Sequence, residues 1–454
     1  MTRTRIPSTV AVLLIVSLSA GCSERDLAGL KPAPFSDDPV VFDDSFGDGV
    51  DFQAFFESLL DAVAIDTDVA YPGTAASLRV TVPGPGAEGG TFAGGAFTSA
   101  SPRDLSSYDA LAFYAKSSTD NRTLNLAGLG NDNTGTSLYE TWRSAIPLTT
   151  NWSRIYIPIP NPSRLNMERG LFFFAEGHEN NAGYTIWFDE IEFVRLSTIA
   201  SLRPAMATCN IESFVGASVT PPATRLTVAV NGEDVDVEHS HRFFDYFSSD
   251  ETVAQATGGA ITVVGGGTAT LTAKLNNVDV EGVVTLSVYE LAPIPDYPSD
   301  DVIALYCDVY PTVPVDFWRT IWSTSGPVED IDAGGNAVKK YTGLARQYAG
   351  IEFTTQLIDA SGMTHLRLDV LATEGSIFRV KLVDFGEDGE FPPADESELV
   401  FNALTEPAFV TGQWSVLDIP LADFDLDTRS HLAQLIISSP DVPTVFVDNV
   451  LFRR

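Results

Sequence analysis

Two aspartates stand in strand-like segments that are otherwise apolar, and their chemistry calls for an explanation. Asp189 lies in 186–195 (IWFDEIEFVR) and Asp448 lies in 445–454 (VFVDNVLFRR). Side chains alternate along a strand, so each carboxylate shares a face with apolar side chains, where an ionised group is costly unless it is paired. Ca²⁺ suits such oxygen ligands, and backbone hydrogen bonds or an arginine partner are the alternative. Further ligand oxygens are expected from earlier strands of the same units: Asp43, Asp44 and Asp308.

Aromatic side chains beside polar ones form the second group with a chemical use. A flat ring stacks on the C–H face of a sugar, and neighbouring polar groups bind its hydroxyls. The stretches 137–144 (SLYETWRS) and 318–322 (WRTIW) have this character. The alternative for any single ring is packing in the core, which we expect for Trp152 and Trp187. The candidate sugar-binding residues are Asn131, Tyr139, Trp142, Arg143, Trp318 and Trp322.

Patterns typical of catalysis or of phosphate binding are weak. With 61 Asp and Glu residues, some carboxylate pair reaches the spacing of a glycosidase by chance. The acidic run 189–192 lacks the Glu-x-Asp-x-x-Glu pattern of laminarinases, and His239 and His241 form only a weak metal pattern. The glycines 265–267 precede neither a helix nor Lys-Ser/Thr, so they form no phosphate loop. A net charge of −34 repels phosphate backbones, which argues against nucleic-acid binding.

A repeat shows which elements must position these residues. Trp152 and Trp414 each begin a Trp-x-x-x-x-Ile-Pro segment, offset by 414 − 152 = 262, and the two aspartates are offset by 448 − 189 = 259. Two related units therefore flank a different middle segment. Alternating stretches such as 77–82 (SLRVTV) predict many short strands, separated by turns rich in Gly and Pro. The sequence predicts an all-β chain.

The middle segment has a signature of its own. It contains 247–254 (FSSDETVA) and 265–273 (GGGTATLTA). This pair resembles the group 2 bacterial Ig-like domains, and the resemblance implies a small β-sandwich that serves as a spacer or an adhesion unit. Cys209 and Cys307 fall at the starts of different units, so we expect two separate buried thiols.

Both outer units resemble carbohydrate-binding modules with the galactose-binding-like β-jelly-roll fold. The first is similar to modules related to complex I intermediate-associated proteins and to cellulase-type binding modules. The third is similar to modules appended to laminarinase-type glycoside hydrolases. The resemblance implies sugar binding without catalysis, and a structural Ca²⁺ is frequent in such families. The motifs that carry it are 93–97 (AGGAF), 105–111 (LSSYDAL), 128–133 (GLGNDN), 313–318 (VPVDFW), 359–365 (DASGMTH) and 418–424 (DIPLADF).

The N-terminus resembles that of a bacterial lipoprotein. Arg3 and Arg5 precede an apolar run that is too short to span a membrane, and 19–22 (SAGC) resembles a lipobox. Cleavage before Cys22 would leave a lipidated cysteine at the start of the mature chain, and the resemblance implies di- and N-acylation, which is more than the two chains needed for stable anchoring. Residues 23–40 are polar and contain prolines, as in a tether.

These observations combine into one predicted organisation and function. We expect a signal peptide (1–22), a tether (23–40), a jelly roll (41–197), an Ig-like domain (198–295) and a second jelly roll (296–454). The predicted function is polysaccharide binding, with capture of a glucan-type polymer at the cell surface, on the outer membrane, for partner glycoside hydrolases. An adhesion or envelope-structural protein without sugar binding is the alternative, and a glycoside hydrolase is a third possibility.

Overall fold

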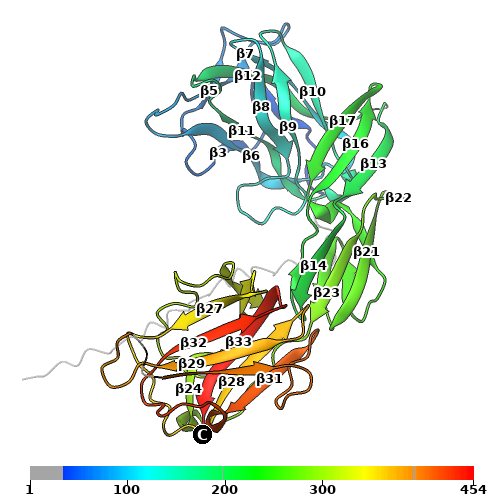
Figure 1. Cartoon of the computed structure of the whole chain (residues 1–454). Coiled ribbons are helices and arrows are strands. Elements are labelled where there is room, and N and C mark those ends of the chain that lie inside the picture. The colour runs from blue at the N-terminus through cyan, green and yellow to red at the C-terminus, as the bar shows by residue number, and fades with distance from the viewer. Residues whose placement is uncertain (1–33, 197, 392, 394) are drawn as a thin grey trace, which may run out of the picture.

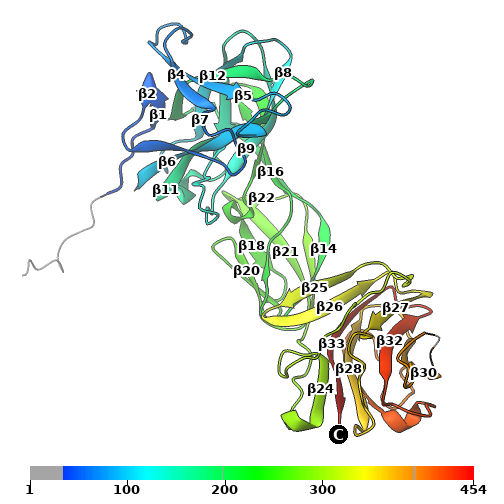
Figure 2. The same cartoon turned by 90° about the vertical axis from the view of Figure 1, so that its left-hand side faces the viewer.

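The computed structural model describes residues 34–196, 198–391, 393 and 395–454, and this part of the chain is all-β, as expected. Its strands form six sheets, and three β-rich parts follow one another along the chain (Figures 1 and 2). None of the helices in the described part has the length and apolar character needed to cross a membrane. The short 3-10 helices are η1 (Pro162–Arg164), η2 (His241–Phe243), η3 (Ser299–Asp301) and η4 (Leu421–Asp423).

The first unit is a sandwich of two sheets. One sheet contains β10 (Ser153–Pro158), β7 (Ala110–Ser117), β12 (Tyr184–Val194), β1 (Val40–Asp43), β2 (Ser45–Phe46), β5 (Ser77–Val82) and β4 (Val63–Asp66). The other contains β9 (Thr141–Leu148), β8 (Arg122–Leu129), β11 (Glu168–Gly177), β6 (Phe92–Arg103) and β3 (Val50–Ala54). Between the sheets, alternate residues such as Phe172, Phe174 and Phe188 pack ring against ring and are fully buried.

The middle segment adds strands to this second sheet. A sheet of eight strands runs from β3 through β9 into β17 (Glu233–His239), β16 (Thr224–Val230) and β13 (Ala200–Met206). The joint is the pairing of β17 with β9, where Glu238 lies opposite Trp142 and His239 opposite Thr141. The buried apolar side chains of the first unit and the middle segment accordingly form one continuous cluster. Nothing in the sequence pattern indicated this continuous sheet.

The rest of the middle segment forms two small sheets. The larger contains β14 (Cys209–Phe214), β23 (Val284–Tyr289), β21 (Gly267–Leu275), β18 (Asp245–Ser248) and β22 (Val278–Asp279). The smaller contains β15 (Ser218–Val219), β20 (Ala260–Val263) and β19 (Ala254–Thr257). Cys209 and Cys307 are both free thiols, as expected, although Cys209 is only half-buried.

The third unit is again a two-sheet sandwich with a core of its own. One sheet contains β25 (Val328–Ala333), β26 (Asn336–Thr342), β33 (Thr444–Arg453), β28 (His365–Ala372), β31 (Trp414–Pro420) and β24 (Val302–Tyr306). The other contains β27 (Gln347–Glu352), β32 (Leu432–Ser439), β29 (Phe378–Asp384) and β30 (Asp395–Phe401). As in the first unit, the last strand of the chain segment lies inside a sheet, between the first strand and an internal one.

Aromatic side chains join the third unit to the middle segment. Phe214 of β14 packs edge-on against Phe446 of β33, with ring centroids 5.2 Å apart. The indole nitrogen of Trp414 donates a hydrogen bond to the Glu290 carbonyl oxygen (2.7 Å). An apolar contact of this kind favours a fixed arrangement of the two parts over free rotation about a linker.

The expectation that Trp152 and Trp187 lie in the core is wrong. Both are half-buried and lie outside the core cluster of the first unit, on the outer side of the sheet that contains β12. The ammonium group of Lys116 lies over both rings, 5.8 Å and 5.6 Å from their centroids, and the Trp187 indole nitrogen donates to Asp66 Oδ2 (3.0 Å). An indole tolerates such a place because one edge is polar and its faces attract cations.

Candidate ligand-binding surfaces

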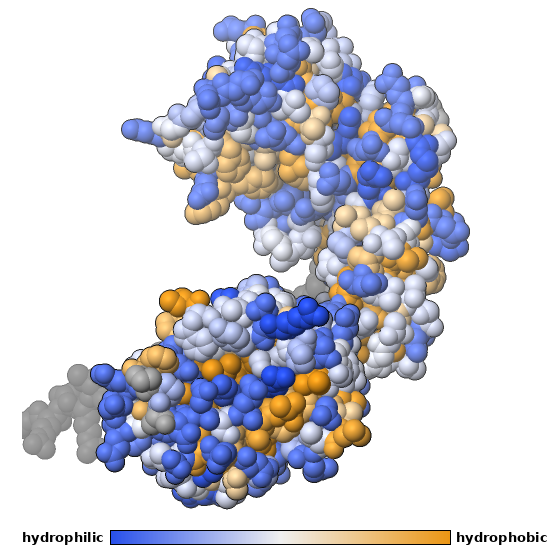
Figure 3. Space-filling view, in the orientation of Figure 1, coloured by the Kyte–Doolittle hydropathy of each residue, from blue (hydrophilic) through white to orange (hydrophobic). Residues whose placement is uncertain are grey.

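A groove runs over the outer face of the four-stranded sheet in the third unit. Its volume is ≈ 560 Å³, and it crosses β27, β32, β29 and β30. Alternation along these short strands sends one set of side chains to the core and the other set into the groove. Hydrophobic residues lie among hydrophilic ones on the surface of the lower unit in Figure 3. The groove is lined by Trp322, Tyr348, Glu352, Val383, Phe385, Phe391, Pro393, Glu396, Gln434 and Ile436.

The indole of Trp322 forms the floor of the groove because Gly350 leaves room for it. A Cβ atom at Gly350 would lie only 1.9 Å from the indole ring, so no other residue could hold the ring against β27. Tyr348, two residues earlier on the same face, has its ring centroid 6.1 Å from that of Trp322, at an interplanar angle of 33°. Each of the two side chains is 37% exposed, so the pair offers ring surface to a ligand.

Polar side chains surround these rings. Gln434 Nε2 donates a hydrogen bond to Glu352 Oε1 (3.1 Å). The two residues lie directly opposite each other on β32 and β27. Lys381 Nζ forms an ion pair with Glu396 (3.0 Å), across the pairing of β29 with β30. A row of mixed donors and acceptors beside a flat apolar surface suits a sugar chain, whose rings have C–H faces and whose edges carry hydroxyls. Phe391 extends the apolar rim and is 80% exposed.

The two glutamates of the groove each have a partner within the protein. Glu352 lies on β27 and Glu396 on β30, and two strands separate them. Glu352 accepts a hydrogen bond from Gln434, and Glu396 forms an ion pair with Lys381. Both carboxylates therefore contribute hydrogen-bonding groups to the groove.

Of the other residues predicted to bind sugar, two line pockets beside polar groups: Trp142, and Tyr139 in a pocket of ≈ 270 Å³ that also contains Asp132 and Glu168. Tyr139 packs against Phe243 of the middle segment, with centroids 5.3 Å apart, while Arg143 Nη1 donates to the Tyr156 carbonyl oxygen (3.1 Å). Trp142 is half-buried on β9, beside β17, in a pocket of ≈ 740 Å³.

Asn131 and Trp318 make contacts within their own units. The Asn131 side chain accepts a hydrogen bond from the backbone N–H of Asn133 (2.8 Å) inside a turn. Trp318 packs edge-on against Tyr306, and Lys339 lies 4.9 Å from its ring centroid. Tyr348, Gly350 and Gln434 were not among the predicted site residues, although the alternation in 347–352 (QYAGIE) puts the first two on one face.

Asp189, in the last strand of the first unit, is fully buried and accepts hydrogen bonds from a distant loop. Its Oδ2 accepts from Tyr71 N (2.8 Å) and from Thr74 Oγ1 (2.9 Å), and its Oδ1 accepts from Glu190 N (2.8 Å). Asp44 holds the same loop, because its Oδ1 accepts from Ala75 N (2.6 Å). These contacts are those expected of the hydrogen-bonding alternative.

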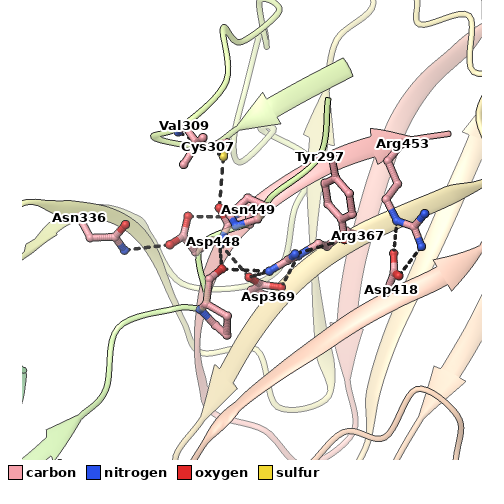
Figure 4. Close-up of polar contacts among 12 residues, drawn as sticks. Tyr297, Cys307, Val309, Asn336, Arg367, Asp369, Asp418, Asp448, Asn449 and Arg453 are labelled. Atoms are coloured by element: carbon pink, nitrogen blue, oxygen red, sulfur yellow. Dashed lines mark hydrogen bonds and ion pairs between the residues drawn. The ribbon is translucent and has the colours of Figure 1, made fainter. Parts of the chain in front are cut away.

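Asp448 has a similar environment in the third unit (Figure 4). Its Oδ2 accepts from Asn336 Nδ2 (2.8 Å), and its Oδ1 accepts from Asn449 N (2.6 Å). Asn449 also donates to Asp369, which receives a bidentate ion pair from Arg367. Burial raises the pKa of Asp448 to about 6, and the two hydrogen bonds only partly offset that increase.

The remaining predicted calcium ligands, Asp308 and Asp43, have surroundings of their own, although the charge of Asp308 contributes to the raised pKa of Asp448. Asp308 Oδ2 accepts from Ala337 N (2.8 Å), and Asp43 lines a small pocket with Glu190 and Glu192. In residues 34–454, apart from the three undescribed positions, no group of three or more His, Cys, Asp or Glu side chains is placed to hold a metal ion. N–H and O–H donors make three hydrogen bonds to the carboxylate of Asp189 and two to that of Asp448. Calcium binding stays a prediction.

Comparisons with known proteins agree with a carbohydrate-binding fold in the first unit. Residues 38–195 match the family model described as carbohydrate binding domain 30. No curated protein matches the chain. The match covers β1 to β12, so the N-terminal region is a sandwich like those of family 30 carbohydrate-binding modules.

Several solved structures are similar to parts of the chain. The family 30 module of a cellulosomal cellulase of Clostridium thermocellum is 18% identical, with 36% of this chain and 96% of that chain covered and a TM-score of 0.25. A family 11 module from the same organism, in complex with a β-1,3-1,4-mixed-linked tetrasaccharide, is 15% identical, with 36% and 98% covered and a TM-score of 0.25. A β-1,2-glucanase from Parabacteroides distasonis is 14% identical, with 57% and 40% covered and a TM-score of 0.26.

The raised pKa of Asp448 predicts a pH-dependent contribution to stability. The folded state holds the carboxyl proton more tightly than the unfolded state, so this contribution is complete below pH ~4 and is lost as the pH rises through about 6. Relative to Asp448→Asn, the wild type should lose about 2–3 kcal/mol between pH 4 and pH 7. Urea denaturation of both proteins at the two pH values measures the difference. A difference that does not change with pH would contradict the predicted protonation of Asp448.

The calcium prediction is decided by metal analysis of the full chain. If the carboxylates bind Ca²⁺, protein dialysed against calcium and then against calcium-free buffer retains the ion, and Asp189→Ala or Asp448→Ala retains less. A chelator then also lowers the melting temperature of the wild type, because a ligand of the native state is removed. Protein that retains no calcium and melts unchanged in chelator supports the hydrogen-bonding alternative instead.

Proposed function

We propose that this protein binds a neutral, glucan-type polysaccharide without cleaving it. The observation that carries the proposal is the exposed ring surface of Trp322, seated on Gly350 beside Tyr348 and bordered by polar side chains. A sugar ring buries its C–H face on such a surface while its hydroxyls bind the neighbouring polar groups. The match of residues 38–195 to a carbohydrate-binding family supports the same function for the first unit.

The charge of the protein favours a neutral polymer. A net charge of −34 repels polyanions such as uronic acid polymers, and the groove itself contains Glu352 and Glu396. Hydroxyl groups bind carboxylates well without adding charge. Within neutral polymers, a glucan is the proposed class.

Two outer units on one chain make capture of a long polymer stronger. Once one unit holds the polymer, the second unit binds the same polymer within the complex. The local concentration of polymer at the second unit is then set by the link between the two units and no longer by the bulk concentration. This arrangement suits a protein that retains polymer for partner glycoside hydrolases, and such enzymes are the proposed partners.

Attachment to the cell surface is part of the proposal. Cys22 and the signal peptide lie outside the described residues, so this part rests on the lipobox-like 19–22 and the charged and apolar residues before it. Lipidation at Cys22 would anchor the protein outside the cytoplasm, with the outer membrane as the proposed location. The two jelly rolls separated by an Ig-like domain are likewise proposed from the sequence motifs.

Affinity electrophoresis against glucans, mannans and xylans tests the proposal. The wild type should be retarded by at least one glucan. Trp322→Ala should raise the dissociation constant measured from that retardation about tenfold, because it removes the ring surface of the groove. Phe247→Ala is the matched control, since Phe247 is an exposed aromatic residue (49%) outside the groove.

Other outcomes distinguish the alternatives. If the wild type is retarded by none of the polymers, the adhesion or envelope-structural alternative replaces polysaccharide binding. If incubation with polymer releases reducing sugar, and Glu352→Gln abolishes the release, the protein is a hydrolase. If Phe247→Ala and Trp322→Ala weaken retardation equally, the groove is not the binding surface.

A further inference from the structure

The eight-stranded sheet runs from the first unit into the middle segment (Figure 1), and the strand pairing places one row of residues across it. Residues directly opposite each other on neighbouring strands share a face of the sheet. The strand registers therefore place one residue of each strand on the same outer face. In order along the sheet, the row is Gln53, Ala96, Phe173, Gly128, Trp142, Glu238, Arg225 and Ala205.

The row crosses from the first unit to the middle segment at Trp142. Trp142 is half-buried, whereas its neighbours in the row, Glu238 and Arg225, are exposed. All three line the pocket of ≈ 740 Å³, and the loop 220–223 forms another part of its wall. An indole on one strand, followed by a carboxylate and a guanidinium on the next two, combines a stacking surface with a hydroxyl acceptor and a hydroxyl donor.

A buried imidazole forms part of the wall of the same pocket. His239 is only 3% exposed, and its Nδ1 lies 2.9 Å from the Ser240 carbonyl oxygen. Burial lowers the pKa of His239 to about 4, so the ring is neutral. Phe244 packs edge-on against the ring at 4.8 Å and holds it in place, so this wall of the pocket is fixed.

We propose that this pocket is a second saccharide subsite, shared between the first unit and the middle segment. A hexose unit of the bound polysaccharide stacks on Trp142, and its hydroxyls bind Glu238 and Arg225. The middle segment then takes part in recognition as well as spacing the outer units. This inference rests on the proposed polysaccharide binding and extends it to residues outside the matched range 38–195.

The test uses full-length chains in a Trp322→Ala background, which removes the ring surface of the third-unit groove. In that background, Arg225→Ala and Glu238→Gln should each raise the dissociation constant for the retarding glucan about fivefold. Both side chains are exposed, so these changes should leave the fold intact. The matched controls are Arg203→Ala and Asp234→Asn, an ion pair (2.6 Å) on β13 and β17 outside the pocket, which should leave binding unchanged.

The two proposals fail in different ways. Wild-type protein that binds no polysaccharide overturns both. Wild-type protein that binds a glucan, with Arg225→Ala and Glu238→Gln no weaker than Arg203→Ala and Asp234→Asn, overturns the shared subsite and leaves polysaccharide binding standing. A further check is Trp142→Ala, which removes the stacking ring and should weaken binding while circular dichroism and melting temperature stay unchanged. If this variant unfolds, the result of the two exposed substitutions decides.

Discussion

Each outer unit closes only when its last strand enters the middle of a sheet. β12 pairs with β1, β5 and β7, and β33 pairs with β24, β26 and β28. Each of these strands carries a carboxylate that is buried on the outer side of its sheet, and that carboxylate has to be satisfied there. Asp189 meets this need by binding the loop at Tyr71 and Thr74, and Asp448 does so through Asn336 and Asn449. The opposite sheet of each sandwich is left with an outer face on which ligand-binding side chains can be displayed.

The three parts of the chain are joined by contacts that limit their relative movement. Main-chain pairing at Trp142 and Glu238 makes one sheet from the first unit and the middle segment. Phe214, Trp414 and Phe446 form an aromatic contact at the other junction, and Arg367 donates to the Pro293 carbonyl oxygen of the connecting segment (3.0 Å). Surfaces that are already fixed in relative position lose less conformational freedom when a long polymer binds both, which favours affinity.

The sequence predicted the strands well, and it predicted poorly which face of a strand is buried and which strands pair. The alternation in 77–82 gave a strand with the bounds of β5, because a period of two is a local property. Trp152 and Trp187 were expected in the core, yet they lie on an outer face with Lys116 over their rings. Alternation shows that two side chains share a face, but it does not show which face is buried, since that depends on what packs against it.

By itself, the sequence determined that this chain is all-β, that two related units flank a third kind of segment, and that tryptophans next to polar residues are candidates for sugar binding. Only the tertiary structure decided which of these tryptophans meet polar groups from other strands. Trp322 lies in the groove because Gly350 of β27 makes room for it, and Trp142 lies beside Glu238 because β17 pairs with β9. The physical reason is that local patterns record side-chain alternation, whereas the register between distant strands is set by the burial and hydrogen bonding of the whole sheet.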